Sequence, residues 1–229
     1  MANTISSTPT PKSPSFCYAD KYSNSEILND PKKAKAFQDE FLKSESAYFD
    51  VCHDKRTGLV YDGVDLNPKT GEVEKVRNWS APSKECLDLG VLVKALEGDE
   101  KAVAVVGHGD VAKAKAKAVE LLGQKLGSYN EFQSQNPGYA GFLPWYFINQ
   151  DKTVATPDWQ GKIPGLDNGE WMWTMLVAEK ALRDTGNTDL AAQYQKYNQQ
   201  LQDNVVKVFY DPDGRACRGD VRIKNPGDP

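Results

Sequence analysis

The chain has 229 residues, 39% of them hydrophobic and 26% charged, which is typical of one globular domain or of part of a larger one. Lysine and arginine number 28 and aspartate and glutamate 32, so the net charge of -4 excludes the large basic field that nucleic-acid binding requires. The apolar runs fall far short of the roughly 20 residues that a membrane span needs. We therefore expect neither nucleic acid nor a membrane as a partner.

The N-terminal segment, residues 1–22, is rich in Ser, Thr and Pro and lacks the apolar core and charged start of a signal peptide. We expect this segment to be flexible and residues 23–229 to form one domain. The two histidines are accompanied by no C-x-x-C pair, so we expect neither a metal site nor a cofactor. The pairing of four cysteines stays open: Cys17, Cys52, Cys86 and Cys217.

Five segments repeat their apolar residues at the helical period, and they alternate between two kinds. Three carry a single apolar stripe and are predicted to be outer helices: residues 31–52, 110–126 and 188–209. Two are apolar almost all round and are predicted to be enclosed by protein: residues 83–96 and 168–183. The order outer, inner, outer, inner, outer predicts an all-α fold, with helical hairpins laid around a ring that this chain leaves unfinished.

The links between these helices are unequal in length. Links from an inner to an outer helix are short, whereas the outer-to-inner links are long, from His53 to Pro82 and from Gly127 to Asp167. Loops of more than roughly 12 to 15 residues in a compact domain are usually functional or disordered. We expect both long links to converge on one face, above the N-termini of the inner helices.

Aromatic residues concentrate between Pro137 and Met175, a stretch that contains four of the five tryptophans. Much of this stretch is the second long link, where a tryptophan seldom finds a dry core to fill. Two interpretations have equal weight. The cluster is either a platform on which the flat face of a sugar ring stacks, or a plug that closes the mouth of the ring and holds the link down.

Two carboxylates, Asp167 and Glu170, stand where the second inner helix begins, beside Trp171 and Trp173. Such an apolar setting favours the neutral form that a general acid needs, and glycoside hydrolysis requires two carboxyl groups. The spacing also matches a capping box, in which both side chains bond backbone amides at a helix N-terminus. Catalysis and capping therefore both stay open for this pair.

A third motif imitates a dinucleotide-binding turn. The apolar run Ala102 to Val106 is followed by Gly107, His108 and Gly109 and then by a helix. The second strand and its acidic residue, which should follow, are missing, so we do not expect a dinucleotide. We interpret His108 as a turn residue and His53 as the exit of the first helix.

The segment Gly138 to Trp145, with Trp159, Ile163 to Gly165 and Leu166 to Glu170 after it, resembles the fungal-type endo-β-1,2-glucanases of glycoside hydrolase family 162. The resemblance runs from about Ala36 to the C-terminus and is most specific over these residues. It implies an (α/α)6 barrel, in which six inner helices are ringed by six outer ones, and an endo-acting, inverting hydrolase of β-1,2-glucan. It also favours an extracellular location.

The resemblance implies roles for individual residues. Glu170 matches the Asn-Gly-Glu position of the family and is the expected general acid, with Asp167 supporting substrate hydroxyls or the path of the proton. The general base is expected toward the C-terminal end of the barrel, beyond Pro229, because the chain offers no counterpart. The residues expected to line the glucan cleft are Tyr139, Phe142, Trp145, Trp159 and Trp171.

Two alternatives to a working enzyme remain, because twelve helices need far more chain than 229 residues. The first is a noncatalytic carbohydrate-binding or interaction module that uses the same aromatic link. The second is a half-ring completed by another chain, which would cover the apolar edges of the inner helices. In each case the expected ligand is a β-glucan oligosaccharide or polysaccharide.

Overall fold

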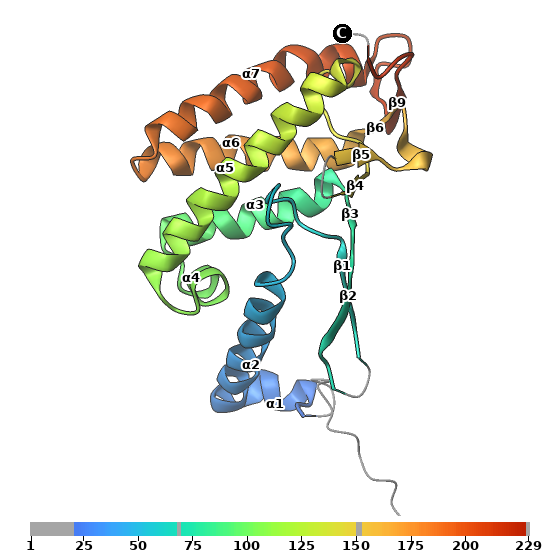
Figure 1. Ribbon diagram of the computed structural model, residues 1–229. Coiled ribbons are helices and arrows are strands. Elements are labelled where there is room, and N and C mark those ends of the chain that lie inside the picture. Colours follow the sequence, from blue (N-terminus) through green and yellow to red (C-terminus); the bar gives the residue numbers. More distant parts are fainter. Residues whose placement is uncertain (1–20, 68–69, 150–152, 228–229) are drawn as a thin grey trace, which may run out of the picture.

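The computed structural model describes residues 21–67, 70–149 and 153–227. Nearly all of the expected flexible segment, residues 1–22, lies outside these ranges, and so does Cys17. The described part is mainly helical, with four small antiparallel sheets beside the helices (Figure 1). Its α-helices are α1 (Asn24–Asn29), α2 (Pro31–Phe49), α3 (Pro82–Glu97), α4 (Glu100–Gly107), α5 (Val111–Gln135), α6 (Gly165–Asp184) and α7 (Thr188–Phe209).

The strands are short and lie mostly within the two long links. Two single-turn 3-10 helices, η2 (Pro137–Tyr139) and η3 (Pro157–Trp159), lie in the second link. The strands are β1 (Gly63–Leu66), β2 (Val73–Arg77), β3 (Trp79–Ser80), β4 (Tyr146–Ile148), β5 (Thr153–Ala155), β6 (Lys162–Pro164), β7 (Tyr210–Asp211), β8 (Ala216–Cys217) and β9 (Asp220–Arg222).

Local sequence signals explain where most helices begin and end. Asp30, Asp99 and Asp110 precede α2, α4 and α5, and each side chain accepts hydrogen bonds from backbone amides of the first turn. Gly98 ends α3 in the left-handed conformation, with φ of 84°, which costs a glycine little. All five helices expected from the apolar pattern are present. None of the described helices is long and apolar enough to cross a membrane.

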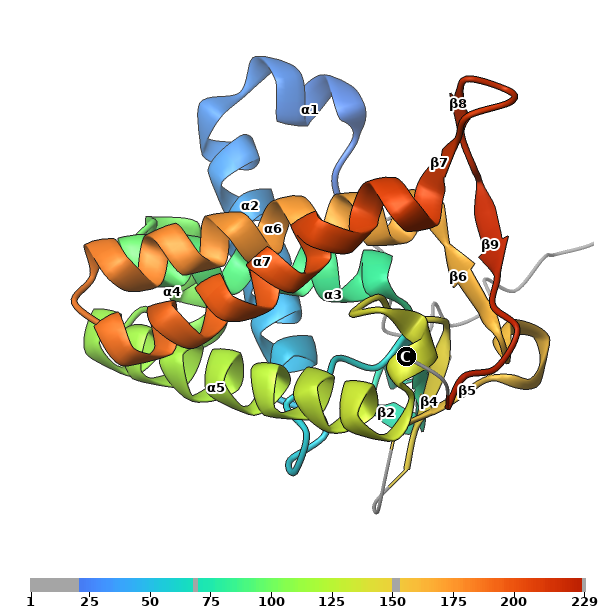
Figure 2. The same cartoon turned by 90° about the horizontal axis from the view of Figure 1, so that it is seen from above.

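The packing order follows the alternation of the pattern. Helices α3 and α6, the expected inner pair, pack against each other, while α7 packs on α6 and α5 on α3. Figure 2 shows α5 and α7 side by side along this pair, with α2 behind. The core between the helices is formed by the buried faces of α3, α5, α6 and α7, which include Leu89, Leu92, Leu96, Leu121, Leu122, Leu126, Met175, Leu182, Tyr194 and Leu201.

The two inner helices are not enclosed on every side, contrary to what their apolar pattern predicts. Leu87 on α3 is 71% exposed, and Trp173 and Val177 on α6 are 73% and 46% exposed. The apolar pattern identifies the residue types correctly but cannot tell which neighbours cover them. One face of the α3 and α6 pair is therefore apolar and open in the described chain.

The structure agrees with one further expectation and corrects another. The run Ala102 to Val106, which imitates a strand, belongs to helix α4, so the glycine turn after it ends a helix and a dinucleotide motif is excluded. His108 is indeed a turn residue, with φ of 51°. Helix α5 does not end at residue 126, as expected, but continues to Gln135, because Tyr129 and Phe132 extend its buried stripe. Gly127 lies within the helix and has no atom within 4 Å of the place where a Cβ would be. The second link is therefore shorter than expected.

The two long links do converge, as expected. Strand β3 from the first link pairs with β4 from the second, and β5 completes a three-stranded antiparallel sheet. Strand β3 of this sheet stands just before Pro82, the first residue of α3, and β6 of the neighbouring β6-β9 sheet directly precedes Gly165, the first residue of α6. Figure 1 shows these strands gathered with β6 and β9 at one end of the long helices. The link residues are thus placed above the N-termini of the inner pair.

Candidate active site

Glu170 lies on the open face of α6. Its side chain is exposed, and within the described residues its carboxylate has no hydrogen bond or ion pair with the protein. Its charge acts on Cys86 of the neighbouring helix α3: burial raises the pKa of the Cys86 thiol, the Thr174 hydroxyl lowers it, and the charge of Glu170 raises it further. The carboxylate is therefore accessible from the face that α3 and α6 leave open.

Asp167 is not a capping residue. Helix α6 begins at Gly165, three residues earlier than the pattern predicts, and its N-cap is Pro164, which makes no side-chain cap. The Asp167 carboxylate instead accepts a hydrogen bond from the indole Nε1–H of Trp145, over 2.8 Å. Three positions apart on one helix, Asp167 and Glu170 are neighbours on its surface. The capping-box interpretation is thus wrong, and both carboxylates are available for another role.

Asn168 ties the second link to the start of α6. It is completely buried, and its Oδ1 accepts a bond from the backbone amide of Leu143 over 3.0 Å. Its Nδ2 donates to the carbonyl oxygens of Leu143 and Pro164, both over 2.8 Å. Sequence reasoning treated this residue only as part of a motif.

Three tryptophans form a stacked column beside Asp167. The ring centroids of Trp79 and Trp145 are 5.4 Å apart, with an angle of 19° between the ring planes. The ring centroids of Trp145 and Trp159 are also 5.4 Å apart, with an angle of 23° between the planes. The Lys162 ammonium stands 5.9 Å from the centroid of the Trp159 ring. Because the column includes residues of both links, it holds them together. This geometry favours the plug interpretation for the centre of the cluster.

Three residues expected to line a glucan cleft are core residues. Tyr139 is 1% exposed, and Phe142 and Trp171 are fully buried. Trp171 packs edge-on against Tyr129, with ring centroids 5.0 Å apart. Phe142 packs edge-on against Phe209 at 4.9 Å. Since protein surrounds these rings, a sugar has no access to their faces, and the expectation that they line a glucan cleft is wrong.

Trp173 is a candidate contact residue that the sequence did not single out. It is 73% exposed and follows Glu170 by three positions on α6, which places both on the same face. The pattern around it predicted a ring enclosed by protein. The signal available was the spacing, because Trp171 is one position from Glu170 and Trp173 is three, so the two rings face different sides of the helix.

A buried charged cluster lies behind the site. Lys125 on α5 is completely buried, and its Nζ lies 2.8 Å from both the Glu85 and the Asp88 carboxylates of α3. Burial raises the pKa of Asp88, but the charges of Lys125 and His53 outweigh it and lower the pKa to about 2. Glu85 also accepts bonds from the Tyr146 hydroxyl and the Val60 amide, so the cluster anchors both links to the helices.

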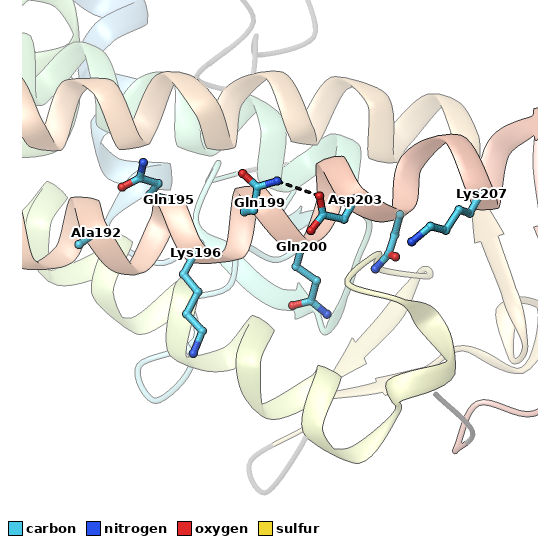
Figure 3. A pocket seen from close by; sticks show the side chains of 8 residues that line it. Ala192, Gln195, Lys196, Gln199, Gln200, Asp203 and Lys207 are labelled. Atoms are coloured by element: carbon cyan, nitrogen blue, oxygen red, sulfur yellow. Dashed lines mark hydrogen bonds between the residues drawn. The ribbon is translucent and has the colours of Figure 1, made fainter.

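Two hollows of the described chain lie away from Glu170. The hollow drawn in Figure 3 is lined only by side chains of α7, mostly glutamine and lysine, with Gln199 bonded to Asp203 over 2.8 Å. A second hollow lies near the end of α2 and holds His53 and His108. Within the described ranges no group of three or more His, Cys, Asp or Glu is arranged to hold a metal ion. The cysteines described, Cys52, Cys86 and Cys217, are free thiols.

The chain is similar to known carbohydrate-active enzymes. The family model of endo-beta-1,2-glucanase SGL matches residues 59–227. Two solved structures of the endo-beta-1,2-glucanase from Talaromyces funiculosus superpose with a TM-score of 0.83 at 28% identity. One is a complex with sophorose and the other a glutamate-to-glutamine mutant with beta-1,2-glucan. A comparison with curated proteins gave no match.

The similarity is unequal in extent on the two sides. In both superpositions 93% of this chain is covered, but only 43% of the other chain. This chain therefore spans less than half the length of the two structures it matches.

Proposed function

The chain belongs to the endo-beta-1,2-glucanase SGL family of glycoside hydrolases, and on that basis we propose that it acts in the endo-hydrolysis of β-1,2-glucan, with Glu170 as general acid. The observation that carries the proposal is the position of Glu170. Its carboxylate is exposed on the open face of α6, unpaired within the described residues, and one turn from Asp167. From this position the carboxylate is free to reach a substrate bound on that face.

The chemistry proposed for Glu170 is protonation of the oxygen that leaves when a glycosidic bond breaks. An inverting hydrolase pairs such an acid with a base that activates a water on the opposite side of the sugar ring, and the two carboxyl groups stand roughly 6.5 to 9.5 Å apart. Asp167 is proposed to support this acid or to bind substrate hydroxyls. The general base is proposed to come from a part of the enzyme that the described residues do not include.

The glucan is proposed to lie across the open face of α3 and α6. Trp173 offers an exposed ring one turn from Glu170, and aromatic faces suit the axial C–H groups of glucose. Trp159 borders the same end of α6 as part of the tryptophan column. The two ligands bound in the matched structures, sophorose and beta-1,2-glucan, are consistent with a substrate of this class.

We propose that the helices form part of an (α/α)6 barrel, with α3 and α6 in its inner wall and α2, α5 and α7 outside. The contact between α3 and α6 and their flanking by α5 and α7 support this architecture. In a complete barrel this open face, with Leu87 and Val177, would be turned toward the central cavity that further inner helices enclose. Sedimentation velocity would test the alternative that a second copy covers this face, which predicts a dimer that Leu87→Glu dissociates.

The proposed function is tested by incubating the full-length enzyme that contains these residues and its general base with linear β-1,2-glucan and analysing the products. Release of short oligosaccharides is expected, with loss of at least about 100-fold in kcat for Glu170→Gln. The matched control is Asp184→Asn, because Asp184 is an exposed carboxylate at the far end of α6. Proton NMR of the first products should show the α-anomer if the reaction inverts. Retention of activity in Glu170→Gln would remove this residue from the mechanism.

The same experiment separates catalysis from simple binding. A noncatalytic carbohydrate-binding module would bind β-1,2-glucan in calorimetry and release no oligosaccharide, and its affinity would be indifferent to Glu170→Gln. That outcome would replace the proposed hydrolase by the binding module.

A further inference from the structure

The geometry points to Trp145 as a positioning residue whose indole N–H holds Asp167 in place, rather than as a surface for stacking sugar. This inference rests on the proposed function of the Asp167 and Glu170 pair. The bond from Trp145 Nε1 to Asp167 Oδ2 measures 2.8 Å, a length typical of a donor paired with a charged acceptor. It joins the second link to the first turn of α6, next to the proposed acid.

Both faces of the Trp145 ring are already occupied. Trp79 covers one face and Trp159 the other, each with ring centroids 5.4 Å apart and nearly parallel planes. A sugar that stacks on an aromatic residue needs a free face. The part of Trp145 left to act on the site is therefore its polar edge, and that edge points at Asp167.

The column that holds Trp145 is itself fixed from several sides. Trp79 on β3 is paired in register with Phe147 on β4. The carbonyl of Trp145 accepts a bond from the Thr156 amide over 2.9 Å. On the other side, the buried Tyr139 hydroxyl accepts a bond from the Gly161 amide over 2.8 Å, next to Trp159. The indole N–H is therefore held in one direction before any ligand binds, as a precise site requires.

The hydrogen bond from Trp145 also competes with the attraction of Asp167 to the first backbone amides of α6. Helix α6 has no side-chain cap, so its first backbone amides attract any nearby carboxylate. Asp167 lies in that first turn and would otherwise turn toward those amides. The Trp145 N–H binds one oxygen of Asp167 and keeps the carboxylate beside Glu170. Without this donor the carboxylate is expected to leave the productive orientation in a large fraction of molecules.

The decisive variant is Trp145→Phe, which keeps an aromatic ring in the column but removes the donor. We expect kcat on β-1,2-glucan to fall about tenfold or more, with KM changed by less than about twofold. In an Asp167→Ala background, adding Trp145→Phe should have no further effect on kcat, because the residue acts through Asp167. The matched variant Trp79→Phe removes an indole from the same column without touching Asp167, and it should change kcat less than twofold.

Two kinetic results would overturn the inference. A rise in KM at constant kcat would mean that Trp145 contacts the glucan directly. Independent, multiplicative effects of Trp145→Phe and Asp167→Ala on kcat would mean that Trp145 serves the fold and not Asp167.

A second measurement does not depend on activity. The five tryptophans should give five indole N–H resonances in a ¹⁵N-labelled sample, and Trp145→Phe identifies one by its loss. In Asp167→Ala that proton should move upfield by about 0.5 ppm or more, since its charged acceptor is gone. A resonance indifferent to Asp167→Ala would refute the positioning role, whereas absence of hydrolysis by the unmodified protein would refute the proposed function instead.

Discussion

Replacing Lys125 by methionine is expected to destabilise the protein far more than replacing an exposed lysine of the same helix. Lys125 is completely buried and is the shared cation of Glu85 and Asp88, 2.8 Å from each. Burial lowers the pKa of Lys125, but the two carboxylates outweigh it and raise the pKa above its ordinary value. Methionine fills a similar volume and leaves both carboxylates buried without that charge.

The magnitude follows from the cost of a broken buried ion pair, about 3 to 5 kcal/mol. For a chain of this size that corresponds to a fall in Tm of roughly 10 °C. The matched control is Lys117→Met, because Lys117 lies two turns earlier on α5, is half-exposed and is paired only with Glu120. An exposed pair of this kind is worth about 0.5 kcal/mol.

The assay is urea unfolding followed by circular dichroism at pH 7 and at pH 5. At pH 7 the full difference between the two variants is expected. At pH 5 Lys125→Met should recover part of its free energy of unfolding, because protonation relieves a buried carboxylate that has lost its cation. Equal destabilisation by both variants, within about 0.5 kcal/mol, or no recovery at pH 5, would refute the argument that charge burial controls this cluster.

Three further predictions concern stability. The pKa of Asp88 is about 2 in the folded protein and 3.8 ordinarily, so its carboxylate contributes about 2 kcal/mol to the free energy of unfolding above pH 4, and this contribution is lost as the pH falls toward 2. Urea unfolding at a series of pH values should show this loss in the unmodified protein and not in Asp88→Asn. Asn168→Ala should cost about 2 to 4 kcal/mol in urea unfolding, since it leaves the buried backbone amide and carbonyl of Leu143 unpaired. A cost below about 1 kcal/mol would contradict this anchoring role. Gly165→Ala should lower Tm, because the added Cβ would stand 2.5 Å from the carbonyl oxygen of Arg218. In the control Gly169→Ala, on the same helix, the added Cβ has no atom within 4 Å, so Tm should rise slightly. A higher Tm for Gly165→Ala than for Gly169→Ala would contradict the packing described.

The helical framework could be predicted from the sequence, because the information is local. The apolar stripe of α7 and the nearly continuous apolar pattern of α6 follow from residues within a few positions of one another. The convergence of the two long links could be predicted too, since connection lengths constrain where chain segments meet. Helix α4 was missed because its eight residues read equally well as a buried strand.

The candidate site could be predicted only in part. Asp167 and Glu170 were identified by type and position, but the sequence could not separate capping from catalysis. Where α6 begins depends on contacts with distant residues, including the bond from the Gly165 amide to the carbonyl of Gly219 over 2.8 Å. Lys125 is a similar case, because nothing in its neighbourhood along α5 indicates that two carboxylates of α3 lie around it.

The aromatic residues mark the boundary between the two kinds of information most clearly. The sequence by itself determined that tryptophans gather before and within α6, and that this helix is apolar all round. Only the tertiary structure decided that Trp171 is enclosed while Trp173 is exposed, and that Trp145 lies between two other rings with its N–H on Asp167. The physical reason is that periodicity tells which residues share a face of a helix, whereas what covers that face is set by segments far apart in the chain.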